Sequence, residues 1–299
     1  MGIWTVQGME GSPSDYPMTT TPPSKNIKKL LWITDVHLDR ASDETKSRFL
    51  DKLAGISYDA LLITGDISVA EHLTTHLSEI SWACQERNVY FTLGNHCYFG
   101  SSFSEVDRRV ADLCRQRSNL VPLGHGEIVQ LTQNTALVGH RGWYCGQAGA
   151  GEGTKIECPD RQRIKDFQGL TKAGFFSKLK DLGRESARYF RQVLPKALDG
   201  SRNVIIATHI PPFTQGSGHT NGFCDWNRQP FFSNREAGNV IYGIAKRYGI
   251  AKRFAGGEIS VLAGHTHCPV SARLLPNLAI RVGGAQPGFP AFQEFLTIE

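Results

Sequence analysis

The amino-acid sequence predicts an α/β protein in which a central sheet is covered by other layers. Short apolar runs rich in β-branched residues recur along the chain, and such near-continuous apolarity is typical of strands buried on both faces. Amphipathic stretches with helical spacing lie between several of these runs, which favours strand–helix–strand units with right-handed crossovers. The 299 residues are enough for one large domain with a substantial core.

The expected elements can be placed on the sequence in order. Six apolar runs are predicted to be strands, at 29–34, 60–64, 89–93, 135–139, 203–207 and 259–263. Five amphipathic stretches are predicted to be helices, at 43–55, 71–87, 103–117, 174–198 and 235–249. The fourth helix is expected to stop at Pro195, since proline lacks the N–H group that a helix interior requires. Three strand-like pieces at 270–274, 279–282 and 294–298 predict a second, more antiparallel sheet, giving a sandwich with helices outside.

Three segments do not fit this alternation. Residues 1–27 hold clusters of Pro, Ser, Thr and Gly, which predict a flexible arm or a misplaced start of the chain. Residues 28–299 are then expected to form a single domain. Within it, 141–173 is rich in glycine and basic residues and 210–234 opens with two prolines. Long irregular segments of this kind tend to be functional, so we expect cap or lid loops here.

The composition is ordinary for a soluble globular protein, with 40% hydrophobic and 20% charged residues. The net charge of +5 suits an anionic substrate, but the basic residues are interspersed with acids, so no specific nucleic-acid binding is indicated. No apolar run approaches the roughly 18 residues that span a membrane, and no secretory signal is evident. The seven cysteines are odd in number and lack CxxC spacing, so we expect free thiols in a reducing cytoplasm.

Polar side chains follow five of the predicted strands at the point where each strand ends. These are Asp35 with His37, Asp66, Asn95, His209, and His265 with His267. In open α/β sheets, ligands bind beyond the carboxyl ends of the strands, so these side chains are expected to meet at one rim. Carboxylate oxygen, amide oxygen and imidazole nitrogen suit divalent ions such as Mn²⁺, Fe and Zn²⁺. The sequence therefore predicts a metal site.

The spacing of these residues bears on how many ions they hold. In an extended segment, side chains two residues apart point to the same face, so Asp35 and His37 can bind the same ion. His265 and His267 can do the same, or can be divided between two ions. A single carboxylate such as Asp66 can bridge two cations about 3.5–4 Å apart. A Gly or Thr precedes most of the motifs, which allows the backbone to turn sharply there.

The ordered set Asp35-x-His37, Gly65-Asp66, Gly94-Asn95-His96, His209 and Gly264-His265-x-His267 resembles the calcineurin-like metallophosphoesterase superfamily. The resemblance implies a four-layer α/β/β/α sandwich and two divalent transition-metal ions. It implies that the first ion is held by Asp35, His37, Asp66 and His267. It implies that the second ion is held by Asp66, Asn95, His209 and His265. It also implies that His96 is the catalytic residue, which donates to the leaving-group oxygen or to the scissile phosphate.

The expected activity is hydrolysis of a phosphomonoester or phosphodiester by a metal-bridging hydroxide, with a small phosphorylated substrate such as a nucleotide. One residue departs from the family pattern, since Cys97 stands where an acid usually follows Asn95-His96 and orients the histidine. This departure motivates an alternative, a metal-binding scaffold or weakened enzyme that recruits a partner. A redox sensor based on Cys97 would require a lowered thiol pKa.

Substrate contacts are less constrained by the sequence. Arg141 follows a predicted strand and is a candidate for phosphate contact, with an ordinary salt bridge as the alternative. His219 either reaches over the site or caps a loop. Trp143, Tyr144 and Trp226 either line the pocket or pack in the core.

Overall fold

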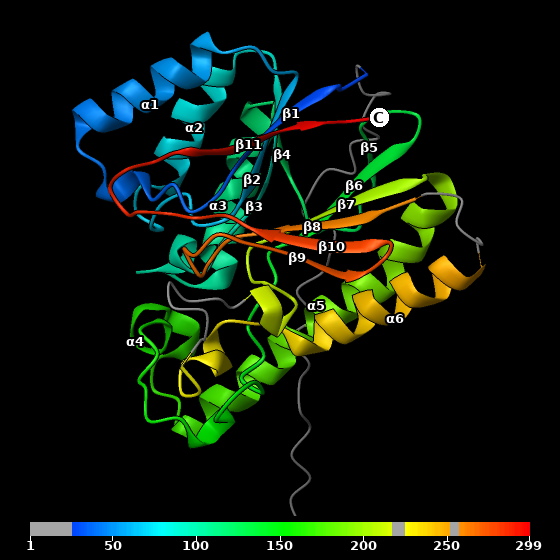
Figure 1. The fold of residues 1–299 in the computed structure, drawn as a ribbon. Helices are drawn as coiled ribbons and strands as arrows, with labels where there is room; N and C mark the ends of the chain where they lie inside the picture. Colours follow the sequence, from blue (N-terminus) through cyan, green and yellow to red (C-terminus); the bar gives the residue numbers. More distant parts are fainter. Residues whose placement is uncertain (1–25, 217–224, 252–256) are drawn as a thin grey trace, which may run out of the picture.

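Two β-sheets packed face to face carry the fold in residues 26–216, 225–251 and 257–299, the part of the chain that the computed structural model describes (Figure 1). The first sheet has the order β11–β1–β2–β3–β4, formed by Phe292–Thr297, Lys29–Ile33, Ala60–Thr64, Asn88–Thr92 and Leu120–Pro122. The second has the order β5–β6–β7–β8–β10–β9, formed by Val129–Gln130, Thr135–His140, Asn203–Thr208, Ile259–Ala263, Leu278–Val282 and Val270–Leu275. Strands β1 to β4 run parallel, as do β6, β7, β8 and β10.

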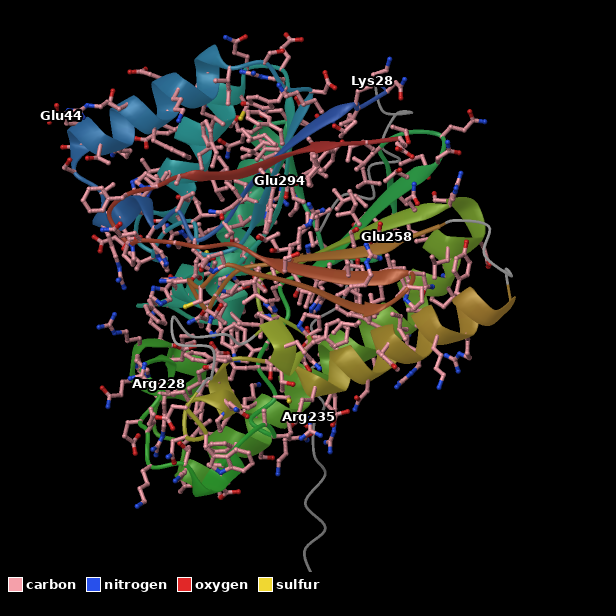
Figure 2. The ribbon with its side chains drawn as sticks, in the orientation of Figure 1. Lys28, Glu44, Arg228, Arg235, Glu258 and Glu294 are labelled. Atoms are coloured by element: carbon pink, nitrogen blue, oxygen red, sulfur yellow. The ribbon has the colours of Figure 1, made fainter. Side chains whose placement is uncertain are left out.

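Helices form the two outer layers. The first sheet is covered by α1 (Asp43–Gly55), α2 (Leu73–Cys84) and α3 (Phe103–Gln116). The second is covered by α5 (Lys172–Gly200) and α6 (Arg235–Ala251). The charged side chains labelled on α1 and at the start of α6 in Figure 2, Glu44 and Arg235, lie on these outer layers. The predicted four-layer α/β/β/α sandwich is therefore confirmed, and it forms one domain.

Strand β1 explains why the apolar runs are nearly continuous. Leu30 and Trp32 belong to the core between the two sheets, whereas Leu31 and Ile33 belong to the core beneath α1 to α3. Because successive side chains of a strand point to opposite faces, a strand in an inner layer needs apolar residues at nearly every position.

The ends of two helices differ from the prediction for local reasons. Helix α5 does not stop at Pro195 but continues to Gly200. Proline removes one helical hydrogen bond, yet the neighbouring Leu194 and Leu198 are buried against the second sheet, and this packing keeps the last turn helical. Helix α2 is shorter than predicted because Gln85 adopts a positive φ of 55°, which ends the helix after Cys84.

The C-terminal pieces do not form a sheet of their own, so that prediction is wrong. Strands β9 and β10 form an antiparallel hairpin, but β10 also pairs in parallel with β8 and so extends the second sheet. Strand β11 instead joins the first sheet, antiparallel to β1. Its Leu296 lies in the core between the sheets, so burial there decides the pairing of β11.

The chain between β6 and α5 folds together with residues 225–234 into a lobe beside the N-terminal part of α5 (Figure 1). We call residues 141–171 and 225–234 the lobe. It contains a short helix, α4 (Asp160–Arg163), and the buried Phe167 contacts both α3 and α5 through ring centroids 5.5 and 5.0 Å apart. The role of these segments as a lid stays a prediction.

Two further expectations concern membrane-spanning helices and cysteines. No helix in the described ranges is both long and apolar enough to cross a membrane. The six cysteines that lie in those ranges are all free, as expected, and Cys224 lies outside them. The predicted N-terminal arm, 1–27, falls almost entirely outside the described residues.

Candidate metal centre

The structure brings the seven predicted ligands together where the strands of both sheets end. Asp35 and His37 follow β1, Asp66 follows β2, Asn95 follows β3, His209 follows β7, and His265 and His267 follow β8. Five of the seven are buried, and His265 and His267 are partly exposed, with the His267 side chain at 28%. Parallel strands from two facing sheets thus deliver all seven polar side chains to one rim.

The backbone at this rim is held in an uncommon conformation. Positive φ values between 39° and 72° occur at Asp35, His37, Asp66, His265 and His267. Gln85 is the only other non-glycine residue in the described part of the chain with a positive φ. Left-handed backbone is costly for residues with a Cβ atom and gathers at functional sites, where the surrounding fold enforces it.

Gly94 shows why a small residue precedes a ligand. A Cβ atom at this position would collide with Oδ1 of Asp66 and would lie 2.7 Å from Nε2 of His209. Any larger residue would therefore occupy the space in which the ligands converge. Gly94 thus allows the ligands to converge, as expected. It does so mainly by leaving room for the side chains of Asp66 and His209, and less by allowing a sharp turn of the backbone.

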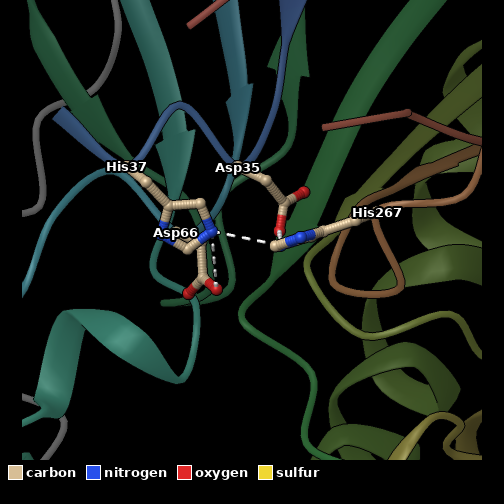
Figure 3. Close-up of side chains that lie close together, drawn as sticks. All are labelled: Asp35, His37, Asp66 and His267. Carbon is tan, nitrogen blue, oxygen red and sulfur yellow. Dashed lines mark hydrogen bonds and ion pairs between the residues drawn. The ribbon is translucent and has the colours of Figure 1, made fainter. Parts of the chain in front are cut away.

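The first group of ligands consists of Asp35, His37, Asp66 and His267, which Figure 3 shows around one point. One ligand atom from each lies within 4.8 Å of the others. Nε2 of His37 is 3.1 Å from Nε2 of His267, which in turn is 3.3 Å from Oδ1 of Asp35. Oxygen and nitrogen ligands at this separation fit a divalent transition-metal ion.

A second group lies on the other side of Asp66. Oδ1 of Asn95 is 3.1 Å from Nε2 of His209 and 3.1 Å from Nδ1 of His265. Nε2 of His209 is also 3.4 Å from Oδ1 of Asp66. The two carboxylate oxygens of Asp66 thus face different groups, because its Oδ2 lies 3.8 Å from Nε2 of His37.

Hydrogen bonds on the outer side determine which atoms of the second group face inward. His209 places Nδ1 2.9 Å from the carbonyl oxygen of Thr64, and His265 places Nε2 2.8 Å from that of Phe231. Each outer nitrogen must therefore donate, and a neutral imidazole has only one N–H group. When both rings are neutral, the inner nitrogens present lone pairs to the oxygen of Asn95. Three lone pairs directed at one point fit a bound cation.

In the metal-free protein the pKa values of these two histidines shift in opposite directions. Burial lowers the pKa of His265 to about 3, so its inner nitrogen carries no proton at neutral pH. Burial also opposes charge on His209, but the adjacent Asp66 carboxylate outweighs burial and raises the pKa of His209 to about 9. A proton on His209 therefore stands where a cation would bind.

His96 lies beside both groups with its ring at the rim. Its Nε2 is 3.9 Å from Oδ2 of Asp66, and its ring stacks on Phe99 with centroids 4.2 Å apart. Nη2 of Arg40 lies 3.5 Å from Nδ1 of His96. Because a guanidinium can only donate, this contact assigns the lone pair to Nδ1 and the N–H group to Nε2, which faces Asp66. Burial lowers the pKa of His96 to about 4, so the ring is neutral at neutral pH.

Cys97 does not supply the negative charge of the acid that the family pattern places after Asn95-His96. Its side chain is fully buried in the core beneath α1 to α3. Burial and the nearby Asp66 raise the pKa of the Cys97 thiol to about 12. A redox sensor at this position is therefore not supported, since the thiolate is strongly disfavoured.

Arg141, a predicted candidate for phosphate contact, lies in a salt-bridge network. Its guanidinium donates to the hydroxyl of Tyr98 at 2.9 Å and to Asp107 at 3.2 Å, and it pairs with Glu185 at 3.4 Å. These contacts match the predicted salt bridge, and a contact of Arg141 with the substrate phosphate stays a prediction. His219, the other predicted substrate contact, lies outside the described residues.

The aromatic candidates separate into core and surface. Trp143 and Tyr144 are buried, whereas the side chain of Trp226 is exposed, at 64%. Tyr144 also stacks beside His265, with ring centroids 6.0 Å apart. Trp143 and Tyr144 are therefore packed in the core, and Tyr144 also lies against the predicted metal ligand His265.

Two further residues at the site were missed from the sequence. Asp160, in the lobe, accepts a hydrogen bond from Nδ2 of Asn95 at 3.2 Å, although 65 positions separate them. Arg40 reaches His96 from the short helix that follows Asp35-x-His37. Position alone could have drawn attention to Arg40, which lies three residues after a ligand. No sequence signal indicates Asp160, since only the folding of the lobe places it there.

Comparisons with known proteins agree with the geometry. A transmembrane protein with a metallophosphoesterase domain from Bos taurus is 28% identical over 134 residues, which are 44% of this chain and 29% of that protein. The chain thus spans less than a third of the length of that relative. A dimetal phosphatase from Danio rerio has a similar solved structure, with a TM-score of 0.53 and 11% identity, covering 87% of this chain and 88% of that one. At such an identity this likeness shows the fold alone.

The family assignment comes from a comparison with the family as a whole. The family model of the calcineurin-like phosphoesterases matches residues 28–269, a span that includes both ligand groups and His96. The chain belongs to the calcineurin-like phosphoesterase family.

Proposed function

We propose that this protein hydrolyses a phosphomonoester or a phosphodiester at a centre of two divalent ions, each held by one of the two ligand groups. The observation that carries the proposal is the position of Asp66, whose two carboxylate oxygens face different groups of oxygen and nitrogen ligands. A carboxylate in that position suits a bridge between two ions. Mn²⁺, Fe and Zn²⁺ all match these ligand types.

The ligand groups and His96 have different roles around the reacting phosphate. When bound, two such ions supply positive charge for the phosphoryl oxygens and lower the pKa of a water molecule enough for it to attack phosphorus. His96 is neutral, with its N–H group on Nε2 facing the centre, so it can donate a hydrogen bond to the leaving-group oxygen or to the phosphate. This role does not require an acid at position 97.

Arg40 replaces Arg141 as the proposed contact to the substrate phosphate. Its only ion pair in the described ranges is with Asp39, at 4.0 Å, and its side chain is 40% exposed. A guanidinium beside the centre can donate two parallel hydrogen bonds to a phosphoryl group. A small phosphorylated molecule such as a nucleotide is the proposed substrate class, and the cytoplasm remains the predicted location.

Metal analysis combined with hydrolysis assays tests this function. We expect the purified protein to contain two equivalents of transition metal, and its activity on p-nitrophenyl phosphate or bis(p-nitrophenyl) phosphate to disappear on chelation. Asp66→Ala should abolish activity, whereas Asp112→Ala, which removes a half-exposed carboxylate on α3, should not. The ratio of rates on the two esters distinguishes a monoesterase from a diesterase.

Two outcomes of this experiment would contradict the proposal. Hydrolysis that survives both chelation and Asp66→Ala would exclude metal-dependent catalysis. Two bound ions without turnover of either ester would instead favour the alternative, a metal-binding scaffold that recruits a partner.

A further inference from the structure

The side-chain amide of Asn95 can adopt two orientations that have nearly the same shape. Rotation by half a turn about its last bond exchanges the oxygen with the NH₂ group. Only one orientation presents the oxygen to His209 and His265, and only an oxygen can serve there as a metal ligand.

The inner nitrogen of His265 by itself favours the opposite orientation when no ion is bound. Because Nε2 of His265 donates to the carbonyl oxygen of Phe231, its Nδ1 presents a lone pair to Asn95. An NH₂ group turned inward could donate to that lone pair, and this hydrogen bond would have to be broken before an ion could bind. A carboxylate outside the centre that accepts from the NH₂ group would keep the amide in the ligand orientation.

Asp160 is placed to supply this constraint. It lies on α4 of the lobe with only 3% of its surface exposed, and its Oδ1 accepts from Nδ2 of Asn95 at 3.2 Å. Its Oδ2 accepts from the hydroxyl of Tyr144 at 2.6 Å, which fixes the carboxylate. A carboxylate only accepts hydrogen bonds, so the opposite orientation of Asn95 would bring two oxygens together in a buried place.

We propose that Asp160, fixed by Tyr144, is a positioning residue that holds the amide of Asn95 in its metal-binding orientation. The proposal rests on the proposed function in one respect, namely that the group formed by Asp66, Asn95, His209 and His265 binds an ion. It gives the lobe a role in assembling the centre, because the positioning carboxylate comes from outside the two sheets. It differs from a purely structural role, in which Asp160 would only attach the lobe to the domain.

A series of variants separates these two roles. Asp160→Leu removes both acceptors at similar size, whereas Asp160→Asn can still accept from Asn95 through its oxygen while donating to Tyr144. Asp166→Asn is the matched control, because Asp166 also attaches the lobe, through the backbone N–H of Phe103 at 2.8 Å, without contacting a ligand. Tyr144→Phe removes only the hydroxyl and keeps the test available if the leucine variant does not fold.

Titration of the metal-free proteins with Mn²⁺ gives the first measurement. We expect Asp160→Leu to bind one of two ions about 10- to 100-fold more weakly than wild type, with the other unchanged. Tyr144→Phe should show a smaller loss, and Asp160→Asn and Asp166→Asn little or none. Equal affinities in wild type and Asp160→Leu, or an equal loss in Asp166→Asn, would overturn the proposal.

The side-chain amide signal of Asn95 in the nuclear magnetic resonance spectrum gives a second measurement that requires no metal. Its assignment follows from its absence in Asn95→Asp. We expect slow hydrogen exchange of this NH₂ group in wild type and Asp166→Asn, and a shifted signal in Asp160→Leu. An unchanged signal in Asp160→Leu would contradict the positioning role even if the wild type bound fewer than two ions. A wild type with fewer than two ions would count against the two-ion function alone.

Discussion

Nδ1 of His209 lies 2.9 Å from the carbonyl oxygen of Thr64, so the opposite nitrogen of this imidazole is the one that faces Asp66 and Asn95. In the metal-free protein the carboxylate of Asp66 favours a proton on that nitrogen and, against the effect of burial, raises the pKa of His209 to about 9. A cation and a proton therefore compete for one position, which makes metal binding dependent on pH.

Metal binding at pH 7 is expected to release about one proton per protein molecule from His209, because its pKa of about 9 means that it is protonated before the ion binds. The apparent affinity should rise with pH and level off above about 9. Because the pKa of His209 is higher in the folded protein, protonation of His209 stabilises the metal-free fold. This stabilisation is fully present below about pH 6.5 and is lost as the pH rises through 9. Calorimetric titration in buffers of different protonation enthalpy measures the release, and its absence at pH 7 would contradict the assignment.

Arg40→Ala is expected to reduce kcat/KM for a phosphoester by about 10- to 100-fold, since a hydrogen bond to a charged group contributes ~1.5–3 kcal/mol. Metal content should remain that of the wild type, because Arg40 contacts His96 rather than a ligand. Arg48→Ala is a suitable control, as Arg48 lies on α1 and pairs with the exposed Glu44. Steady-state kinetics measure this effect. An unchanged kcat/KM in Arg40→Ala would contradict a contact between Arg40 and the substrate.

Gly94→Ala is expected to prevent metal binding, because the added methyl group would collide with the Asp66 carboxylate and the His209 imidazole. The same substitution at Gly243, in α6, meets no atom within 4 Å and should raise stability by about 0.5–1 kcal/mol. Metal content and thermal unfolding of the two variants test this contrast. A Gly94→Ala protein that retains its metal would show that the ligands do not need this close approach.

Glu185→Gln is expected to lower stability slightly at neutral pH and to leave kcat/KM unchanged. Burial alone would raise the pKa of Glu185, but the hydrogen bond with His140 and the charge of Arg141 outweigh it and lower the pKa to about 2. Because the pKa of Glu185 is lower in the folded protein, its ionised carboxylate stabilises the fold above about pH 4.3. This stabilisation is lost as the pH falls through 2.

The side chain of Glu185 is 44% exposed, so solvent screens its pairs and the effect should be about 1 kcal/mol or less. Chemical unfolding at several pH values measures it, with Asp181→Asn on the same helix as control. A decrease in kcat/KM without a loss of stability would instead indicate that Arg141 and its partners contact the substrate.

The sequence determined the layers of the fold and the ligands of the centre. Strand β1 is apolar at consecutive positions because both of its faces are buried, and this pattern is visible without coordinates. The ligands could be recognised because parallel strands end at a common edge, so residues directly after strands are brought together whatever the rest of the chain does. Asp35 and His37, two positions apart, are the simplest case.

Only the tertiary structure decided the contacts between segments that are distant in sequence. Burial of Leu296 between the sheets sends β11 to the first sheet, and the packing of α5 overrides the local effect of Pro195. Tertiary contacts also decide two features of the site. Arg141 forms a salt bridge with Asp107, and the fold of the lobe places Asp160 next to Asn95. Such contacts depend on which surfaces remain to be buried after the sheets have formed, and that information is not contained in any local pattern of residues.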